Sequence, residues 1–178
     1  SLSAHKFHGP KGVGVLYARR GFPLTNVIEG GAQERGKRAG TENLPGIAAF
    51  GVAGGEMDIA AGAATVRALN AYAVRRLAAV GGVTINSPDG ALPYVLNLSA
   101  GRVRSETMLH FLEERQVFVS SGSACAKGKP SHVLRAMGLS AERADSALRI
   151  SFCRHNTTED VDALCAGLAE GLRVLAHR

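Results

Sequence analysis

From Gly81 onward, short apolar runs alternate with segments that have helical periodicity, and this alternation restricts the possible fold more than any other feature. The runs Val83–Asn86 and Val95–Leu98 are bounded by turn residues, which predicts two strands. At 148–153 apolar and polar residues alternate, which predicts a half-buried strand with one polar face. The second half of the chain therefore predicts an α+β domain built on a small sheet.

Helical segments separate these strands. Ser105 is expected to cap a helix, and residues 117–119 are expected to form a third strand. A short helix is expected to begin at residues 130–132. Asn156 and Glu159 are expected to form a capping box for the last helix. Apolar residues recur at helical spacing in that helix: Val161, Leu164, Leu168, Leu172 and Leu175.

The first half of the chain is organised differently. Residues 13–17 predict a buried strand, and a loop rich in glycine and charge runs from 29 to 40. A long helical stretch is expected from Thr41 to about Val80. Gly54-Gly55 and Gly62 weaken this stretch, so a kinked helix and two separate pieces are both compatible with the sequence.

Composition excludes several classes of protein. Hydrophobic residues make up 46% of the 178 and charged residues 20%, so the chain is globular, and no apolar run reaches the length of about 18 residues that spans a bilayer. The net charge of +6 is spread along the chain and Trp is absent, which disfavours a nucleic-acid partner. Three scattered cysteines predict reduced thiols and a cytoplasmic location. Because no apolar run is long enough to span a bilayer, no membrane partner is expected. No metal site is expected.

Lys6 is the first candidate for chemistry. Ser3 and His5 stand beside it, close to a Gly-Pro turn. The hydroxyl and imidazole could hold a phosphate while the amine forms a Schiff base. A solvated surface lysine is the alternative.

The segment Arg35–Thr41 also has two interpretations. Thr41 at a helix start favours binding of an anion, but it also suits a polar loop that ends in an N-cap.

The most informative stretch is Ser120–Lys129. Cys125 lies there among small residues with two lysines nearby, which predicts an exposed and reactive thiolate. Cys165 belongs to the apolar stripe of the last helix and is expected in the core. Cys153 shares a strand face with Arg149, so it could be a packed residue or a second thiol near a site. Arg149 is ordinarily a surface cation, but on an interior strand face it would need a carboxylate partner from the protein or from a substrate.

Five motifs follow one another along the chain: Ser3-Ala4-His5-Lys6 with Gly9-Pro10-Lys11-Gly12, Glu34-Arg35-Gly36 with Arg38-Ala39-Gly40-Thr41-Glu42-Asn43, Ser121-Gly122-Ser123-Ala124-Cys125, Ser131-His132-Val133-Leu134, and Arg149-Ile150-Ser151. They occur in the order found in cysteine desulfurases of the NifS/IscS type, and the chain resembles that family over essentially its whole length. These enzymes belong to the class V branch of the fold type I pyridoxal phosphate enzymes.

The resemblance implies a role for each candidate. Lys6 is the lysine that forms the Schiff base with pyridoxal 5'-phosphate, and Ser3 and His5 bind its phosphate. Thr41 reaches the phosphate held by the other subunit of a homodimer. Cys125 takes the sulfur of L-cysteine as a persulfide and leaves L-alanine, and Arg149 binds the substrate carboxylate. The sulfur then passes to a protein acceptor or an iron–sulfur scaffold.

The resemblance also implies the fold. Residues 1–44 correspond to the C-terminal edge of the large cofactor domain, 45–80 to a long connecting helix, and 81–178 to the small C-terminal α/β domain. The family's N-terminal half, with the residues that stack on the cofactor ring and face its nitrogen, has no counterpart here. The chain is therefore expected to be a C-terminal portion that is inactive alone.

Two departures from the family pattern and three alternatives remain. Only four residues separate Cys125 from Pro130, which is fewer than in many relatives, and Cys153 stands where relatives usually have Gly or Ser. The alternatives are another class V enzyme (a selenocysteine lyase or an aminotransferase), a non-catalytic fragment for folding or partner binding, and a nucleic-acid module suggested by charge alone.

Overall fold

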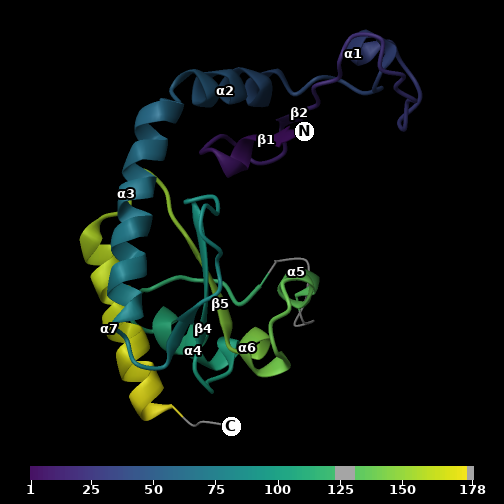
Figure 1. Ribbon diagram of the computed structural model, residues 1–178. Coiled ribbons are helices and arrows are strands. Elements are labelled where there is room, and N and C mark those ends of the chain that lie inside the picture. The colour runs from purple at the N-terminus through teal and green to yellow at the C-terminus, as the bar shows by residue number, and fades with distance from the viewer. Residues whose placement is uncertain (123–130, 176–178) are drawn as a thin grey trace. The chain divides into compact units, whose positions relative to one another are not determined.

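The computed structural model describes residues 1–122 and 131–175, which form two compact units (Figure 1). The first unit comprises Ser1–Asp58, and the second begins at Ile59. The sequence division at 1–44, 45–80 and 81–178 stays a prediction.

The first unit contains little regular structure. A strand β1 (Leu2–Ser3) leads into a 3-10 turn η1 (Ala4–Lys6), and β1 pairs antiparallel with β2 (Gly14–Val15). The buried strand expected at 13–17 is wrong, because β2 has only two residues and Tyr17 is 82% exposed. No second layer of residues 1–58 covers β2, and Val15 is 45% exposed.

Two helices follow in the first unit. The short turn α1 (Gln33–Gly36) precedes α2 (Leu44–Gly55). The expectation that Thr41 begins the helix is wrong: Asn43 is the N-cap, and its side chain accepts a hydrogen bond from the Gly46 amide at 3.2 Å. Asn is a stronger cap than Thr, and Pro45 fits the first turn, where no amide donor is needed. Thr41 therefore lies before the helix.

The helical stretch 41–80 forms two helices, one of the two outcomes that its glycines allow. Helix α2 ends at Gly55 and α3 (Ile59–Ala78) begins after a three-residue break. No single helix in the described part of the chain is long and apolar enough to span a membrane. The pair α2 and α3 meets that test only when the two are taken together across the break.

The second unit contains a three-stranded antiparallel sheet in the order β3-β4-β5. Its strands are β3 (Val83–Ile85), β4 (Val95–Ala100) and β5 (Ala147–Ser151). The remaining helices are α4 (Ser105–Glu113), α5 (His132–Ala136), α6 (Ala141–Asp145) and α7 (Thr158–Val174). Helices α3 and α7 lie on one side of the sheet, and α5 and α6 lie on the other (Figure 1).

One core holds the second unit together. The apolar face of the sheet and the helices α3, α4 and α7 contribute to it. Its fully buried side chains include Val66, Leu77, Leu98, Met108, Leu112, Leu148 and Leu168. Helices α4 and α7 approach closely at Gly171: a Cβ added there would lie 2.7 Å from the Met108 sulfur. The expected α+β domain with a small sheet is confirmed.

Some local expectations are wrong by one residue or one element. Residues 117–119 form no strand, because only the next residue, Ser120, pairs with β5, through a single bridge to Arg149. Arg104, not Ser105, precedes α4 as its N-cap. The capping box of α7 pairs Thr157 with Asp160 rather than Asn156 with Glu159. Asn156 instead accepts a hydrogen bond from the Cys153 amide at 2.8 Å.

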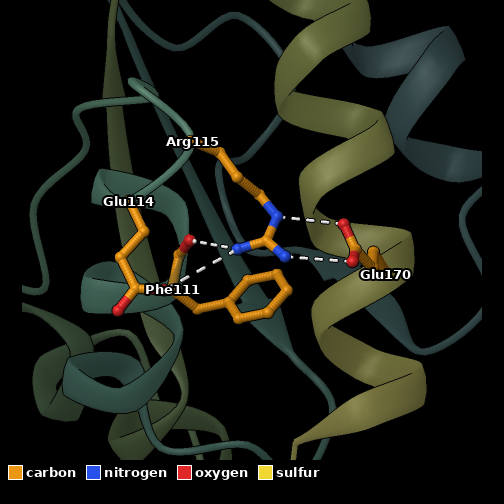
Figure 2. A network of polar contacts seen from close by, with 4 residues as sticks. All are labelled: Phe111, Glu114, Arg115 and Glu170. Carbon is orange, nitrogen blue, oxygen red and sulfur yellow. Dashed lines mark hydrogen bonds and ion pairs between the residues drawn. The ribbon is translucent and has the colours of Figure 1, made fainter.

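A polar clamp joins α4 to α7 at the surface (Figure 2). Arg115 donates two hydrogen bonds of 2.9 Å to the Glu170 carboxylate, and its guanidinium lies 3.5 Å from the centre of the Phe111 ring. The hydrogen bonds from Arg115 lower the pKa of Glu170, and Glu170 raises the pKa of Arg115 in turn. The clamp fixes the end of α4 just before the chain turns towards Ser120.

Candidate active site

The Lys6 turn is built around one small buried residue. Ala4 is fully buried; its amide donates to the Val13 carbonyl at 3.1 Å, and its carbonyl accepts from the amides of Phe7 and Gly9 at 3.0 and 2.9 Å. A Cβ on Gly9 would lie 2.8 Å from the Ala4 Cβ, so no larger residue fits there without a shift. The backbone of the turn is therefore closely defined.

The side chains that flank Ala4 extend to the surface. Ser3, His5 and Lys6 are all exposed. The Ser3 hydroxyl makes no capping hydrogen bond to η1. One turn therefore presents a hydroxyl, an imidazole and an amine within four consecutive residues. These three predicted cofactor residues lie on one exposed turn. The α2 side chain Phe50 supports this turn through an edge-to-face contact with Phe7, with ring centres 5.1 Å apart.

Thr41 lies at the end of a loop closed by side-chain hydrogen bonds. Gln33 accepts from the Gly40 amide at 3.2 Å, and Glu42 accepts from the Glu34 amide at 3.3 Å. Glu34 has φ of +50°, a left-handed conformation that costs a non-glycine residue roughly 1–2 kcal/mol. Thr41 is exposed and belongs to the same unit as Lys6. The loop sets its backbone position just before the cap of α2.

Arg149 occupies the exposed face of β5. Its neighbours Leu148 and Ile150 are buried in the core, so the strand alternation predicted from the sequence is confirmed. The amide of Arg149 donates to the Ser120 carbonyl at 2.6 Å, and its carbonyl accepts from the Ser120 amide at 3.2 Å. Within the described part of the chain, no carboxylate forms an ion pair with its guanidinium.

Ser120 connects the Arg149 strand to the cysteine-bearing segment. Its hydroxyl donates to the Gly122 carbonyl at 2.6 Å and accepts from the Gly122 amide at 3.3 Å, which makes a tight turn. Cys125 lies three residues after Gly122 in the sequence and is outside the described residues. Lys127 and Lys129 are outside them too.

The other two cysteines have distinct surroundings. Cys165 is buried on α7 in the core, as expected, and burial raises the pKa of its thiol. Cys153 is half-buried and lies beyond the end of β5, in the turn that leads to α7. Its carbonyl accepts from the Asn156 amide at 3.2 Å. A second thiol near the site stays a prediction.

A polar network that was not predicted from the sequence lies on the sheet face that carries Arg149. Asn86 donates to Asn97 and to Ser99, each at 2.8 Å, and Ser99 donates to the Arg143 carbonyl at 2.7 Å. Asn97 and Ser99 alternate with Leu96 and Leu98 along β4. That period of two within an apolar run is the signal that could have identified this polar face.

Comparison with known proteins identifies the family to which the chain belongs. Residues 1–164 match the sequence model of the family described as aminotransferase class-V. The chain belongs to the class V aminotransferase family. Among its members, the curated relatives include a cysteine desulfurase from Gluconacetobacter diazotrophicus, 44% identical over 91% of this chain and 42% of the relative. The cysteine desulfurase IscS of Clostridium botulinum is 42% identical over 91% of this chain and 43% of the relative.

Solved structures are similar to the chain as well. A NifS-like protein matches 97% of this chain and 45% of its own length, with a TM-score of 0.82 and 38% identity. A structure of SspA in complex with cysteine matches 88% of this chain and 44% of its own, with a TM-score of 0.65 and 34% identity. The resemblance to the NifS/IscS type is thus confirmed. The chain spans less than half the length of these relatives.

Proposed function

We propose that the enzyme to which this chain contributes is a pyridoxal phosphate-dependent cysteine desulfurase, which converts L-cysteine to L-alanine and a persulfide on Cys125. The observation that carries the proposal is the similarity to named cysteine desulfurases over nine-tenths of the chain. The roles of Lys6, Cys125 and Arg149 come from the sequence motifs that resemble those of the family. The solved SspA relative, which holds cysteine, supports this substrate class.

The residues of the Lys6 turn fit the cofactor by their chemistry. The hydroxyl of Ser3 and the imidazole of His5 are suitable donors for a phosphate, and Lys6 supplies an amine for the aldehyde. Among the described residues none of these three side chains is engaged in an ion pair or hydrogen bond, so they are available to a ligand. When bound, pyridoxal phosphate supplies an electron sink for the bonds at the substrate Cα. Thr41 would contribute to the phosphate of a second subunit in a homodimer.

The protein's own residues would then carry out distinct tasks. Arg149 binds the substrate carboxylate through charge-assisted hydrogen bonds. The Lys6 amine accepts the Cα proton and returns it. The Cys125 thiolate attacks the substrate sulfur, so that an S–S bond forms as the C–S bond breaks. The electron pair of the broken bond stays with Cβ, which takes up the proton lost from the substrate thiol and becomes the methyl group of alanine.

The partners and location are part of the same proposal. The persulfide would pass to a protein acceptor or an iron–sulfur scaffold, and the name IscS of one relative supports this direction. The unpaired state of Cys153 and Cys165 supports a reducing, cytoplasmic compartment. No nucleic acid, membrane or metal is involved in the proposed reaction.

The test uses a polypeptide of family length that carries this sequence, loaded with pyridoxal phosphate. We expect alanine and sulfide from L-cysteine, loss of both in Lys6→Ala, and loss of sulfur transfer with retained cofactor in Cys125→Ser. Arg149→Ala should weaken cysteine binding about a hundredfold. Lys11→Ala, another exposed lysine near the same turn, serves as the control. Normal turnover in Cys125→Ser would contradict the desulfurase assignment and favour a plain aminotransferase. A clear preference for selenocysteine would favour a lyase.

The isolated 178-residue chain is expected to be catalytically silent and to hold little pyridoxal phosphate. It lacks a counterpart for the ring-stacking and nitrogen-facing residues that the resemblance implies. An absorbance scan after addition of pyridoxal phosphate, followed by an alanine assay with cysteine, measures both properties. Sustained alanine production that depends on Lys6 would contradict this expectation.

A further inference from the structure

Asn97 lies directly opposite Arg149 in the sheet. The antiparallel register of β4 and β5 pairs these two residues. Side chains of opposed residues in antiparallel strands project from the same face. Their sequence neighbours Leu96, Leu98, Leu148 and Ile150 are buried in the core, so this face is the one turned away from it. The carboxamide of Asn97 and the guanidinium of Arg149 therefore share the polar face.

The backbone hydrogen bonds bring this pair close. Both main-chain groups of Arg149 bond to Ser120, and the Asn97 carbonyl accepts from the amides of Asn86 and Ser87 at 2.8 and 3.2 Å. The Asn97 amide donates to the Ser87 hydroxyl. Neither residue bonds to the other through its backbone, so they form a non-hydrogen-bonded pair. In such pairs the Cα atoms are only about 4.5 Å apart and the side chains are closer than in the alternate pairs.

A chain of hydrogen bonds fixes which way the Asn97 amide points. The Arg143 guanidinium can only donate, and it donates to the Asn86 side-chain oxygen. The Asn86 nitrogen must therefore be the atom that donates to Asn97 at 2.8 Å, and the atom of Asn97 that accepts is its oxygen, Oδ1. The nitrogen of Asn97, Nδ2, is consequently directed away from Asn86 and keeps its N–H donors.

These donors have no protein acceptor in the described part of the chain. The hydrogen bonds of the Asn97 side chain involve only its oxygen. No buried side-chain nitrogen or oxygen there lacks a partner, so the Asn97 Nδ2 atom is accessible to solvent. The guanidinium of Arg149 is likewise exposed and without a carboxylate. Two adjacent strands thus present an amide donor beside a cation.

We propose that Asn97 is a second substrate-binding residue, and that its Nδ2 donates to the same substrate carboxylate that Arg149 binds. This inference rests on the proposed function, which assigns Arg149 to that carboxylate. A carboxylate has two oxygens and about four acceptor positions, so it can accept from a guanidinium and an amide together. The pair would select amino acids over amines of the same size, because an amine offers nothing to either donor.

The test compares L-cysteine with cysteamine, which lacks the carboxylate, in the pyridoxal phosphate-loaded enzyme of family length. Dissociation constants are measured from the change in cofactor absorbance. Asn97→Ala should weaken L-cysteine binding at least about tenfold, the lower end of the loss expected when a hydrogen bond to a charged group is removed, and leave cysteamine binding within about twofold. Asn97→Asp keeps the oxygen that Asn86 needs and removes the donor, so it should weaken L-cysteine binding at least as much without loss of folding.

Thr84→Ala is the matched control. Thr84 lies on the same polar face, on the opposite neighbour of β4, and is exposed. We expect no change for either ligand. If both Asn97 variants keep the normal affinity for L-cysteine while Arg149→Ala weakens it, the Asn97 assignment is overturned and the proposed function still stands. An equal loss for cysteine and cysteamine would also overturn it, because that pattern indicates a structural role. No effect of Arg149→Ala would remove the carboxylate clamp of the proposed function, and the Asn97 assignment with it.

Discussion

The two units of the chain differ sharply in how much they bury. Residues 1–58 are all described, and only Ala4 and Gly46 among them are buried. Their exposed apolar side chains include Leu2, Leu16, Tyr17, Phe22, Val27, Leu44 and Val52. The second unit instead has a continuous core built from three helices and a sheet. Apolar burial is the dominant favourable contribution to folding, so the second unit has its own source of stability and the first has little.

This difference separates the candidate site residues into two groups. Ser3, His5, Lys6 and Thr41 belong to the unit with almost no core, whereas Arg149 and Asn97 stand on strands anchored by buried leucines. Precise positioning requires rigid support. We therefore expect the substrate-binding side to keep its geometry in the isolated chain, and the cofactor-binding side to depend on additional protein surface.

Hydrogen exchange of the isolated chain should show the largest contrast. Amides of β4, such as Leu96 and Leu98, should exchange on the order of a thousandfold or more slowly than those of β1 and β2, because core strands open only with global unfolding. Exchange measured by mass spectrometry on peptides from both units gives the comparison. Equal protection in the two units would show that the first unit has support that its burial does not reveal.

Paired leucine substitutions should separate the units by stability. Leu98 is fully buried, so Leu98→Ala should lower the free energy of unfolding by about 2–5 kcal/mol. Leu2 is 59% exposed, and Leu2→Ala should change it by less than about 0.5 kcal/mol. Urea unfolding followed by circular dichroism measures both. A large effect of Leu2→Ala would contradict the contrast.

Removing a helix N-cap from each unit should show the same difference between the units, with a smaller change in the free energy of unfolding. Thr157→Ala removes the cap of α7 and should lower the free energy of unfolding of the second unit by about 1 kcal/mol. Asn43→Ala removes the cap of α2 in the first unit and should leave that cooperative transition unchanged. If Asn43→Ala shifts the urea midpoint as much as Thr157→Ala does, the units unfold together.

The smallest expected effect is the loss of stability of the second unit at acid pH. Hydrogen bonds from Asn156 and then Thr157 lower the pKa of Asp160. A carboxyl whose pKa is lower in the folded state stabilises the fold above its unfolded pKa, near 3.9, and this stabilisation is lost as the pH falls through the folded value. Asp160→Asn should therefore flatten the pH dependence of the melting temperature below about pH 4. An unchanged slope would show that Asp160 contributes nothing to this dependence.

Patterns confined to a few neighbouring residues were enough to predict much of this protein. The alternation around Arg149 identified β5 and its polar face, the apolar stripe of α7 placed Cys165 in the core, and the order of five motifs identified the family. These features depend on local periodicity and residue chemistry, which a single sequence contains. The errors at residues 13–17 and 117–119 arose because a strand needs partners, and partners are not a local property.

Only the tertiary structure decided what surrounds each of these residues. The apolar run at 13–17 would suit a buried strand, yet no layer of its own unit covers it. The position of Asn97 opposite Arg149, and the direction of its amide, depend on the register of two strands about fifty residues apart and on a donor from Arg143. The sequence alone determined which chemical groups are present and how they alternate, because those properties are local. The register, the layers and the hydrogen-bond directions follow from long-range pairing, which no short sequence pattern contains.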